Sequence, residues 1–229
     1  MDGELMSSPP TETLEYFYSF RSPYSYLSAP RAFMLPMRFE VDLRFRGVIP
    51  MVMRGQSVPR EKGIHTLRDC AWEARRLGMP FGPMHDPVGE GAMRCLLIAA
   101  HAREQGAARE FVLGAGGAIW GRAVDVASDD GLRPVCEHAG LQWDRCRDAL
   151  GDPRLLEIVE SDTAALGTLG HWGVPVFVFR GELFWGQDRI EDLERSLARA
   201  GLRRPRGSAR FASEAAADRV PSGDEPAGV

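Results

Sequence analysis

The chain has 229 residues, of which 44% are hydrophobic and 26% charged, and its formal net charge is −4. This length is enough for one large domain or a small domain with a sizeable insertion, and the composition is ordinary for a soluble globular enzyme. The negative charge argues against nucleic acid as a partner. Because the sequence shows neither a membrane-length apolar run nor a signal-peptide pattern, we expect a cytosolic protein with no membrane contact.

The first third of the chain alternates strand and helix patterns. Residues 1–12 are polar and contain prolines, which predicts a flexible leader. Alternation and capping signals then predict strands over 14–20 and 39–45 and helices over 22–35 and 62–77. In the first helix, Ser22 is the expected cap and Pro23 the first-turn proline.

Helical periodicity dominates the middle of the chain, and strand signals return after it. The predicted helices cover residues 93–105, 109–120, 131–139, 144–150 and 153–166. Two short strands, 174–179 and 182–185, flank the turn residues Arg180 and Gly181. We expect Asp188 to cap a last helix that ends near Ala200, and the composition beyond it predicts a disordered tail.

This order of elements, βαβ, then helices, then ββα, predicts an α/β fold. One mixed, thioredoxin-like sheet is expected from residues 13–78 and 168–202, flanked by helices. Residues 79–167 form the expected all-helical insertion, residues 1–12 the leader and 203–229 the tail.

Two residue types stand out by their scarcity. The four cysteines have no C-x-x-C spacing and sit among apolar neighbours, which favours buried, reduced thiols over a disulfide or a zinc site. Lys62 is the only lysine among 28 basic residues. A compact ammonium that remains where arginine is otherwise used suggests a task that a planar guanidinium cannot perform, although chance also explains one residue.

The segment Arg21-Ser22-Pro23-Tyr24-Ser25-Tyr26 follows an aromatic strand and opens a helix. Thioredoxin-like proteins keep a Cys-x-x-Cys at such a turn, and here Ser22 and Ser25 hold both cysteine positions. A helix N-terminus favours an anion, so a thiolate brought by a cofactor could be stabilised there with a hydrogen bond from Ser22. The alternative is that Ser22 is only a helix cap.

Two further segments pair with this turn. Val174-Pro175 begins a strand, where a proline lies either at a sheet edge or in a cis bond that faces the active turn. In Trp185-Gly186-Gln187-Asp188, Gln187 and Asp188 could hold the ends of a peptide-like ligand, or Asp188 could serve only as a cap. The glycines at 114, 116 and 117 loosely match a dinucleotide-binding turn, but their helical flanks favour close helix packing.

Together, residues 20–27, 173–175 and 184–189 resemble the 2-hydroxychromene-2-carboxylate isomerase family, a relative of kappa-class glutathione transferases and of DsbA-like oxidoreductases. The similarity extends over residues 14 to 200. It implies a thioredoxin-like homodimer that binds glutathione and acts on a small molecule in aromatic compound metabolism. The chain departs from the family pattern at Ser19, at Met53 and Arg54, and at His65.

The resemblance also implies a role for each matching residue. Ser22 would be catalytic and would hold the glutathione sulfur as thiolate. The glutathione-binding set would be Ser22, Val174, Pro175, Gln187 and Asp188, and the substrate-binding set would be Lys62, Tyr24 and Met53.

The implied reaction is nucleophilic catalysis with a borrowed thiol. The thiolate would add reversibly to an electron-poor C=C of an unsaturated aromatic keto acid, and the resulting single bond would rotate before the thiolate leaves. Two alternatives stay open: a kappa-class-like glutathione transferase, and a non-catalytic thiol-binding or scaffold protein with a DsbA-like fold.

Overall fold

The computed structural model describes residues 11–205, and residues 1–10 and 206–229 lie outside the described part. The predicted leader and tail therefore fall mostly outside it. At its edges, Glu12 already belongs to the first strand and Arg203 forms a β-bridge with Phe39.

Four strands form one mixed sheet in the order β2-β1-β3-β4. The strands are β1 (Glu12–Tyr18), β2 (Val41–Gly47), β3 (Val176–Phe179) and β4 (Glu182–Trp185). β1 runs parallel to β2, and β3 is antiparallel to both β1 and β4. At the β3–β4 turn, Arg180 and Gly181 have positive φ values of 50° and 81°, as a tight hairpin turn requires. The predicted mixed sheet is confirmed.

The two faces of the sheet bury different side chains because successive residues point in opposite directions. On one face the Tyr16 ring stacks on Phe177, with ring centroids 4.7 Å apart, beneath α1 (Pro23–Phe33) and α9 (Ile190–Arg199). On the other face Phe17 and Val176 pack with Leu166 of α8 (Pro153–Thr168). The sheet is therefore the middle layer between helices.

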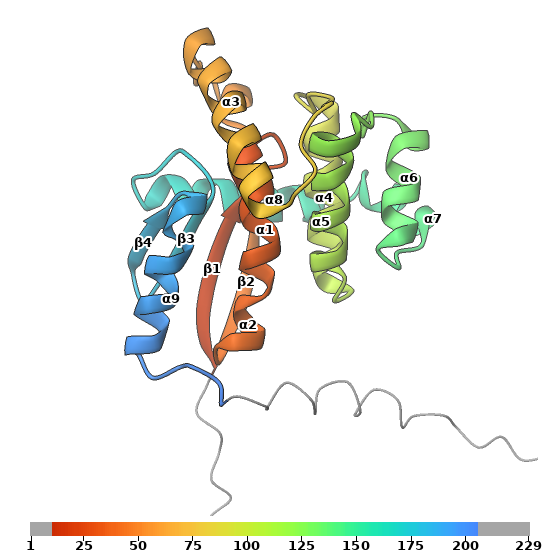
Figure 1. Ribbon diagram of the computed structural model, residues 1–229. Helices are drawn as coiled ribbons and strands as arrows, with labels where there is room; N and C mark the ends of the chain where they lie inside the picture. Colours follow the sequence, from red (N-terminus) through yellow and green to blue (C-terminus); the bar gives the residue numbers. More distant parts are fainter. Residues whose placement is uncertain (1–10, 206–229) are drawn as a thin grey trace, which may run out of the picture.

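Beside the sheet lies a helical block, which Figure 1 shows on the side of α1 away from β4. Its members are α4 (Glu90–Glu104), α5 (Ala108–Arg122), α6 (Asp129–His138) and α7 (Trp143–Ala149). α5 contacts α1 closely because Gly116 has no side chain: a Cβ there would lie 2.8 Å from Tyr26 Cδ2 and 3.2 Å from Tyr18 Oη. The predicted helix-packing role is confirmed for Gly116, whereas a Cβ at Gly114 or Gly117 would have no heavy atom closer than 3.4 Å.

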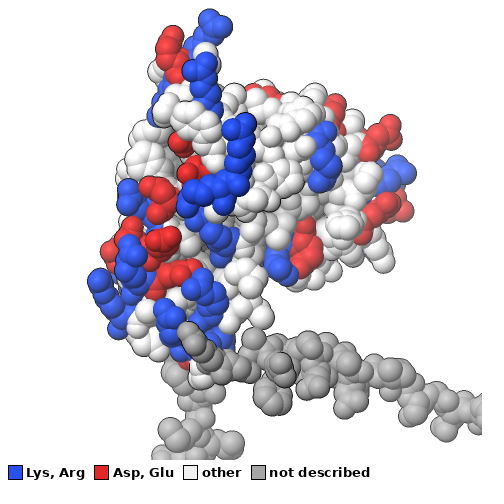
Figure 2. Space-filling model, viewed as in Figure 1, with Lys and Arg blue, Asp and Glu red and all other residues white. Residues whose placement is uncertain are grey.

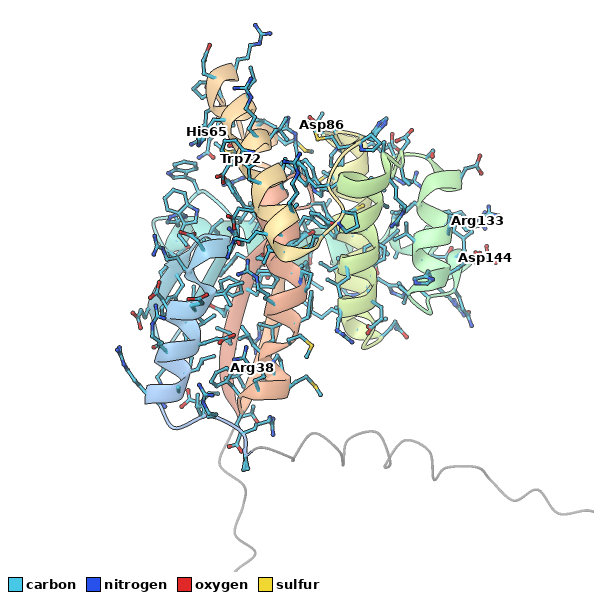
Figure 3. All side chains as sticks on the ribbon, viewed as in Figure 1. Arg38, His65, Trp72, Asp86, Arg133 and Asp144 are labelled. Carbon is cyan, nitrogen blue, oxygen red and sulfur yellow. The ribbon has the colours of Figure 1, made fainter. Side chains whose placement is uncertain are left out.

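α2 (Leu35–Arg38) follows α1 directly, and a 3₁₀ turn, η1 (Met51–Arg54), leads from β2 to α3 (Arg60–Leu77). α3 projects beyond the rest of the molecule in Figure 1. His65 and Trp72 lie on its outer side in Figure 3, away from the helical block, and Trp72 is 64% exposed. The opposite side of α3 faces α1.

All four cysteines are buried free thiols, as the sequence predicts. Between residues 11 and 205, no group of three or more potential metal ligands occurs and no helix is long and apolar enough to cross a membrane. Figure 2 shows charges of both signs mixed over the α9 side, whereas uncharged side chains predominate over α4 and α5.

Candidate active site

Ser22 lies at the turn between β1 and α1, with extended backbone angles (φ −99°, ψ 113°). Its Oγ accepts a hydrogen bond from the Ser25 N–H at 3.1 Å, which makes it the N-cap of α1, and Pro23 fills the first turn. The same hydroxyl donates to the carbonyl of Val174 at 3.2 Å. The capping interpretation of Ser22 is therefore confirmed, and the cap also reaches a segment 152 residues away.

The Val174–Pro175 peptide bond is cis, as predicted from its pairing with the Ser22 turn. It precedes β3, and the Pro175 carbonyl accepts a hydrogen bond from the Gly186 N–H at 3.0 Å. This bond ties the cis-proline loop to the end of β4. A second cis bond, Gly82–Pro83, was not predicted.

The two serines in the cysteine positions lie in different environments. Ser22 is half-buried at a cavity, whereas Ser25 is fully buried and its Oγ accepts from the Ser19 N–H at 3.4 Å. Ser19 also lines the cavity, and its own hydroxyl is buried without a hydrogen-bond partner among the described residues. Both Ser22 and Ser19 therefore line this cavity, whereas Ser25 does not.

The cavity has a volume of about 410 Å³, within the range of small-molecule sites. Its walls come from the Ser22 turn, η1 and the loop after it, the start of α3, and the cis-proline loop. The apolar and aromatic residues among its lining include Ile49, Met51, Val52, Val58, Leu67, Met84, Trp120, Trp172, Val174 and Trp185. Such walls suit a flat, largely apolar ligand that a few polar groups orient.

Charges around the cavity are mostly positive. Among the described lining residues, Arg21, Arg54, Arg60 and Lys62 are cationic and Asp86 is the one carboxylate. Asp86 is already paired, since Arg21 donates to both of its oxygens at 2.8 Å. Figure 3 shows Asp86 on the loop between α3 and α4. In an acidic protein, this lining favours an anionic ligand.

The lone lysine is part of this lining. The Lys62 ammonium lies 5.1 Å from the centroid of the Trp172 ring, a cation–π distance. Trp172 in turn makes an edge contact with Trp185, with ring centroids 5.8 Å apart. The described residues offer Lys62 no carboxylate within ion-pair distance, so its charge is available to a ligand.

Of the other two residues expected to bind substrate, Tyr24 lines the cavity and Met53 does not. The Tyr24 hydroxyl donates to Asp69 at 2.7 Å, and burial together with that bond raises the pKa of Tyr24 well above its ordinary value. The Met53 sulfur lies 3.4 Å from the Gly89 N–H, so Met53 faces the loop before α4. Its neighbours Met51 and Val52 supply the apolar wall.

Gln187 and Asp188 lie outside the cavity lining. Gln187 is buried: its side-chain oxygen accepts from Arg31 and its Nε2 donates to Glu73 at 3.0 Å. Asp188 is exposed and pairs with Arg189 at 3.2 Å. The prediction that Asp188 caps the last helix is wrong, because the 3₁₀ turn η2 (Gln187–Arg189) intervenes and α9 begins without a side-chain cap.

The sequence-based predictions missed three features of the cavity: Arg54, the Trp172–Trp185 wall and the Arg21–Asp86 pair. Trp172 and Trp185 adjoin the two motifs that were identified, so their position beside those motifs was a usable signal. Arg54 was noted only as a departure from the family pattern, and its bond to Trp172 spans 118 residues. Nothing local marks Asp86, because its partner Arg21 lies 65 residues away.

Comparisons with known proteins agree with this geometry. The model of the family described as DSBA-like thioredoxin domain matches residues 13–198. A protein from Sphingobium xenophagum named 2-hydroxychromene-2-carboxylate isomerase is 25% identical over 189 residues, which cover 80% of this chain and 97% of that protein. A protein of the same name from Pseudomonas putida is 23% identical over 193 residues, or 81% of this chain and 94% of its relative.

Solved structures support the same fold. A 2-hydroxychromene-2-carboxylate isomerase superimposes with a TM-score of 0.69 at 20% identity, over 82% of this chain and 95% of the other. The cytosolic disulfide reductase DsbM from Pseudomonas aeruginosa superimposes with a TM-score of 0.62 at 19% identity, over 81% of this chain and 98% of the other. The expected thioredoxin-like, DsbA-like fold and the expected resemblance are confirmed.

Proposed function

The chain belongs to the DSBA-like thioredoxin domain family, and from this premise we propose that it is a glutathione-dependent isomerase of an unsaturated aromatic keto acid. The proposed reaction type follows the curated relatives, which are named 2-hydroxychromene-2-carboxylate isomerase. A solved structure of the similar DsbM reductase contains GSH. For this chain, glutathione, a homodimer and a cytosolic location are parts of the proposal.

The observation that carries the proposal is the contact between the Ser22 hydroxyl and the Val174 carbonyl beside the cavity. A peptide-like thiol that offered its N–H to the Val174 carbonyl would release the Ser22 proton for its own sulfur. One hydrogen bond would then be replaced by two. The Ser22 Oγ would still accept from the Ser25 N–H, so the N-cap of α1 would be kept.

The thiolate form is favoured at this place for two reasons. A hydrogen bond from Ser22 stabilises the charged sulfur more than the neutral thiol, and the positive end of the α1 dipole favours a negative charge. Because Ser22 and Ser25 replace both cysteines of a redox turn, the chain has no sulfur of its own at this turn, and a thiol nucleophile would have to be borrowed.

In the proposed step, a cyclic hemiketal such as 2-hydroxychromene-2-carboxylate first opens: its ring C–O bond breaks, the hemiketal proton passes to the phenolic oxygen, and a conjugated ketone forms. The sulfur lone pair then forms a C–S bond while the π electrons of the C=C move into that carbonyl as an enolate. The former double bond rotates, the enolate electrons re-form it, and the C–S bond breaks to return the thiolate. No electrons are gained or lost overall. Lys62, whose ammonium has no carboxylate partner in the described chain, would stabilise the enolate or the substrate carboxylate.

The test mixes the protein, glutathione and 2-hydroxychromene-2-carboxylate, follows the absorbance change of isomerisation, and analyses the products by mass spectrometry. Catalysis that needs glutathione and returns it unchanged is the expected result. A stable glutathione adduct would instead identify a transferase. Absence of glutathione binding by calorimetry would refute both, because each needs the thiol in the cavity.

A further inference from the structure

Arg54 ends η1 and lines the cavity opposite the start of the cis-proline segment. Its Nε donates to the Ile49 carbonyl at 3.0 Å, and its Nη2 donates to the Trp172 carbonyl at 2.8 Å. These two bonds fix the plane of the guanidinium between two loops. The N–H groups of Nη1 and the second N–H of Nη2 have no partner among the described residues.

The charge of Arg54 has no counterion among those residues. The side chain is half-buried, and none of their carboxylates lies within ion-pair distance of it. Burial lowers the pKa of Arg54, which shows the cost of holding this cation away from water. Both of its partners are neutral backbone carbonyls, so that cost is only partly offset.

The free N–H groups lie at the end of the guanidinium fork that matches a carboxylate. A carboxylate can accept two parallel N–H bonds from the terminal nitrogens of an arginine, and such charge-assisted pairs are short and strong. Because the bonds to Ile49 and Trp172 already order the side chain, a ligand would lose little free energy in immobilising it. Lys62, on the facing start of α3, adds a second uncompensated positive charge to the same cavity.

We propose that Arg54 is the carboxylate-binding residue of this cavity and that it selects acids over their uncharged analogues. The inference rests on the proposed function for the ligands involved. Their carboxylates have two sources: the glycyl end of glutathione, or the unsaturated acid on which the thiolate acts. Arg54 would hold either one end-on through Nη1 and Nη2.

The test compares two ligand pairs that differ only in charge. The first pair is glutathione and its glycine amide, and the second is cinnamate and cinnamamide. Dissociation constants are measured by calorimetry for the wild-type protein and for Arg54→Met, with Arg54→Gln as a second variant that keeps one donor. Arg68→Met is the matched control, because Arg68 is an exposed cation of α3 that does not line the cavity and has no side-chain hydrogen bond among the described residues.

We expect the wild-type protein to prefer the acid of at least one pair by about tenfold to a hundredfold, the range for a hydrogen bond to a charged group. Arg54→Met should abolish that preference, and Arg68→Met should leave it nearly unchanged. The pair that loses its preference identifies the source of the carboxylate. A purely structural arginine would weaken acid and amide equally, and this result would overturn the proposal.

Failures of the two proposals are distinguishable. If neither glutathione nor its amide binds but the cinnamate preference depends on Arg54, the glutathione-dependent function fails and the carboxylate site stands. If glutathione binds with no dependence on Arg54 in either pair, the function stands and the carboxylate site fails. Absence of binding by all four ligands overturns the carboxylate site as well.

Discussion

Removing the Ser22 hydroxyl is the sharpest perturbation of the proposed mechanism. In Ser22→Ala the cap bond to the Ser25 N–H and the bond to the Val174 carbonyl are both lost. Loss of the cap alone should lower the free energy of unfolding by about 0.5–2 kcal/mol. The N-terminus of α1 remains, so the variant still offers part of the anion site.

The effect on the bound thiol is larger and more specific. A hydrogen bond to a charged acceptor contributes about 1.5–3 kcal/mol, and one pKa unit corresponds to about 1.36 kcal/mol. The pKa of enzyme-bound glutathione should therefore rise by about one to two units in Ser22→Ala. The thiolate fraction near neutral pH, and with it the isomerisation rate, should fall by about tenfold to a hundredfold.

The assay titrates the ultraviolet absorbance of the bound thiolate against pH, alongside the rate. Ser25→Ala is the matched control, because Ser25 is fully buried and does not line the cavity; it should change stability but not the thiol pKa. Ser22→Thr keeps a hydroxyl, and the pKa of its bound thiol should stay close to the wild-type value. An unchanged thiol pKa in Ser22→Ala, with glutathione bound, would refute the donor role.

Three further predictions concern other parts of the molecule. Lys62→Met should lower kcat/KM by about tenfold or more at saturating glutathione, and Lys62→Arg should recover part of the loss; an unchanged value would remove Lys62 from the mechanism. Gly116→Ala should lower the free energy of unfolding by about 1–3 kcal/mol in denaturant melts, because its Cβ would overlap Tyr26, whereas Gly117→Ala, 3.4 Å from only a flexible side chain, should not. Burial raises the pKa of Asp162 despite two neighbouring arginines, so the folded state binds this proton more tightly than the unfolded chain. The bound proton contributes fully to stability at acid pH, and this contribution is lost as pH rises through the folded pKa. In Asp162→Asn, the free energy of unfolding from denaturant melts should lack this part of its dependence on pH.

Local patterns were sufficient to predict most of the sheet and the helices. The alternation over 39–45 predicted β2, which spans Val41–Gly47, and Arg180-Gly181 predicted the hairpin turn, because both signals are short-range properties of the sequence. The Ser22-Pro23 pair marked the start of α1 for the same reason. Ends of elements were less accurate, since β1 begins at Glu12, where pairing with Val41 on the neighbouring strand decides its length.

The turn after β4 shows what local patterns cannot decide. Gly186-Gln187-Asp188 fits a capping aspartate, yet Gln187 instead folds into a 3₁₀ turn with its side chain buried. Its partners, Arg31 and Glu73, lie 156 and 114 residues away in the sequence. The hydrogen bonds at both ends of the buried Gln187 amide stabilise the turn more than one exposed cap by Asp188 would. Only the folded chain brings the partners of Gln187 together.

The same contacts bear on how a ligand would be held. For Gln187 to bind a γ-glutamyl group through its side chain, it would have to give up its bond to Glu73 and leave a half-buried carboxylate with one donor fewer. Asp188 is exposed, and binding an ammonium group would cost it only its surface pair with Arg189 at 3.2 Å. We therefore expect the amino end of a bound thiol peptide to be recognised by Asp188, with Gln187 supporting the turn that presents it.

The replacement of both cysteines by serine has a geometric consequence for the proposed chemistry. A redox thiol would be attached directly to Cβ at position 22, whereas a borrowed sulfur must lie a hydrogen bond beyond the Ser22 Oγ. The reacting atom is thereby displaced outward from the turn, and both the thiol and its substrate must fit in front of it. In front of the turn lies the cavity of about 410 Å³ between η1, α3 and the cis-proline loop, whose lining is largely apolar. The Ser22 turn would therefore set the protonation state of the borrowed sulfur, while η1 and the Trp172–Trp185 wall would determine which electrophile reaches it.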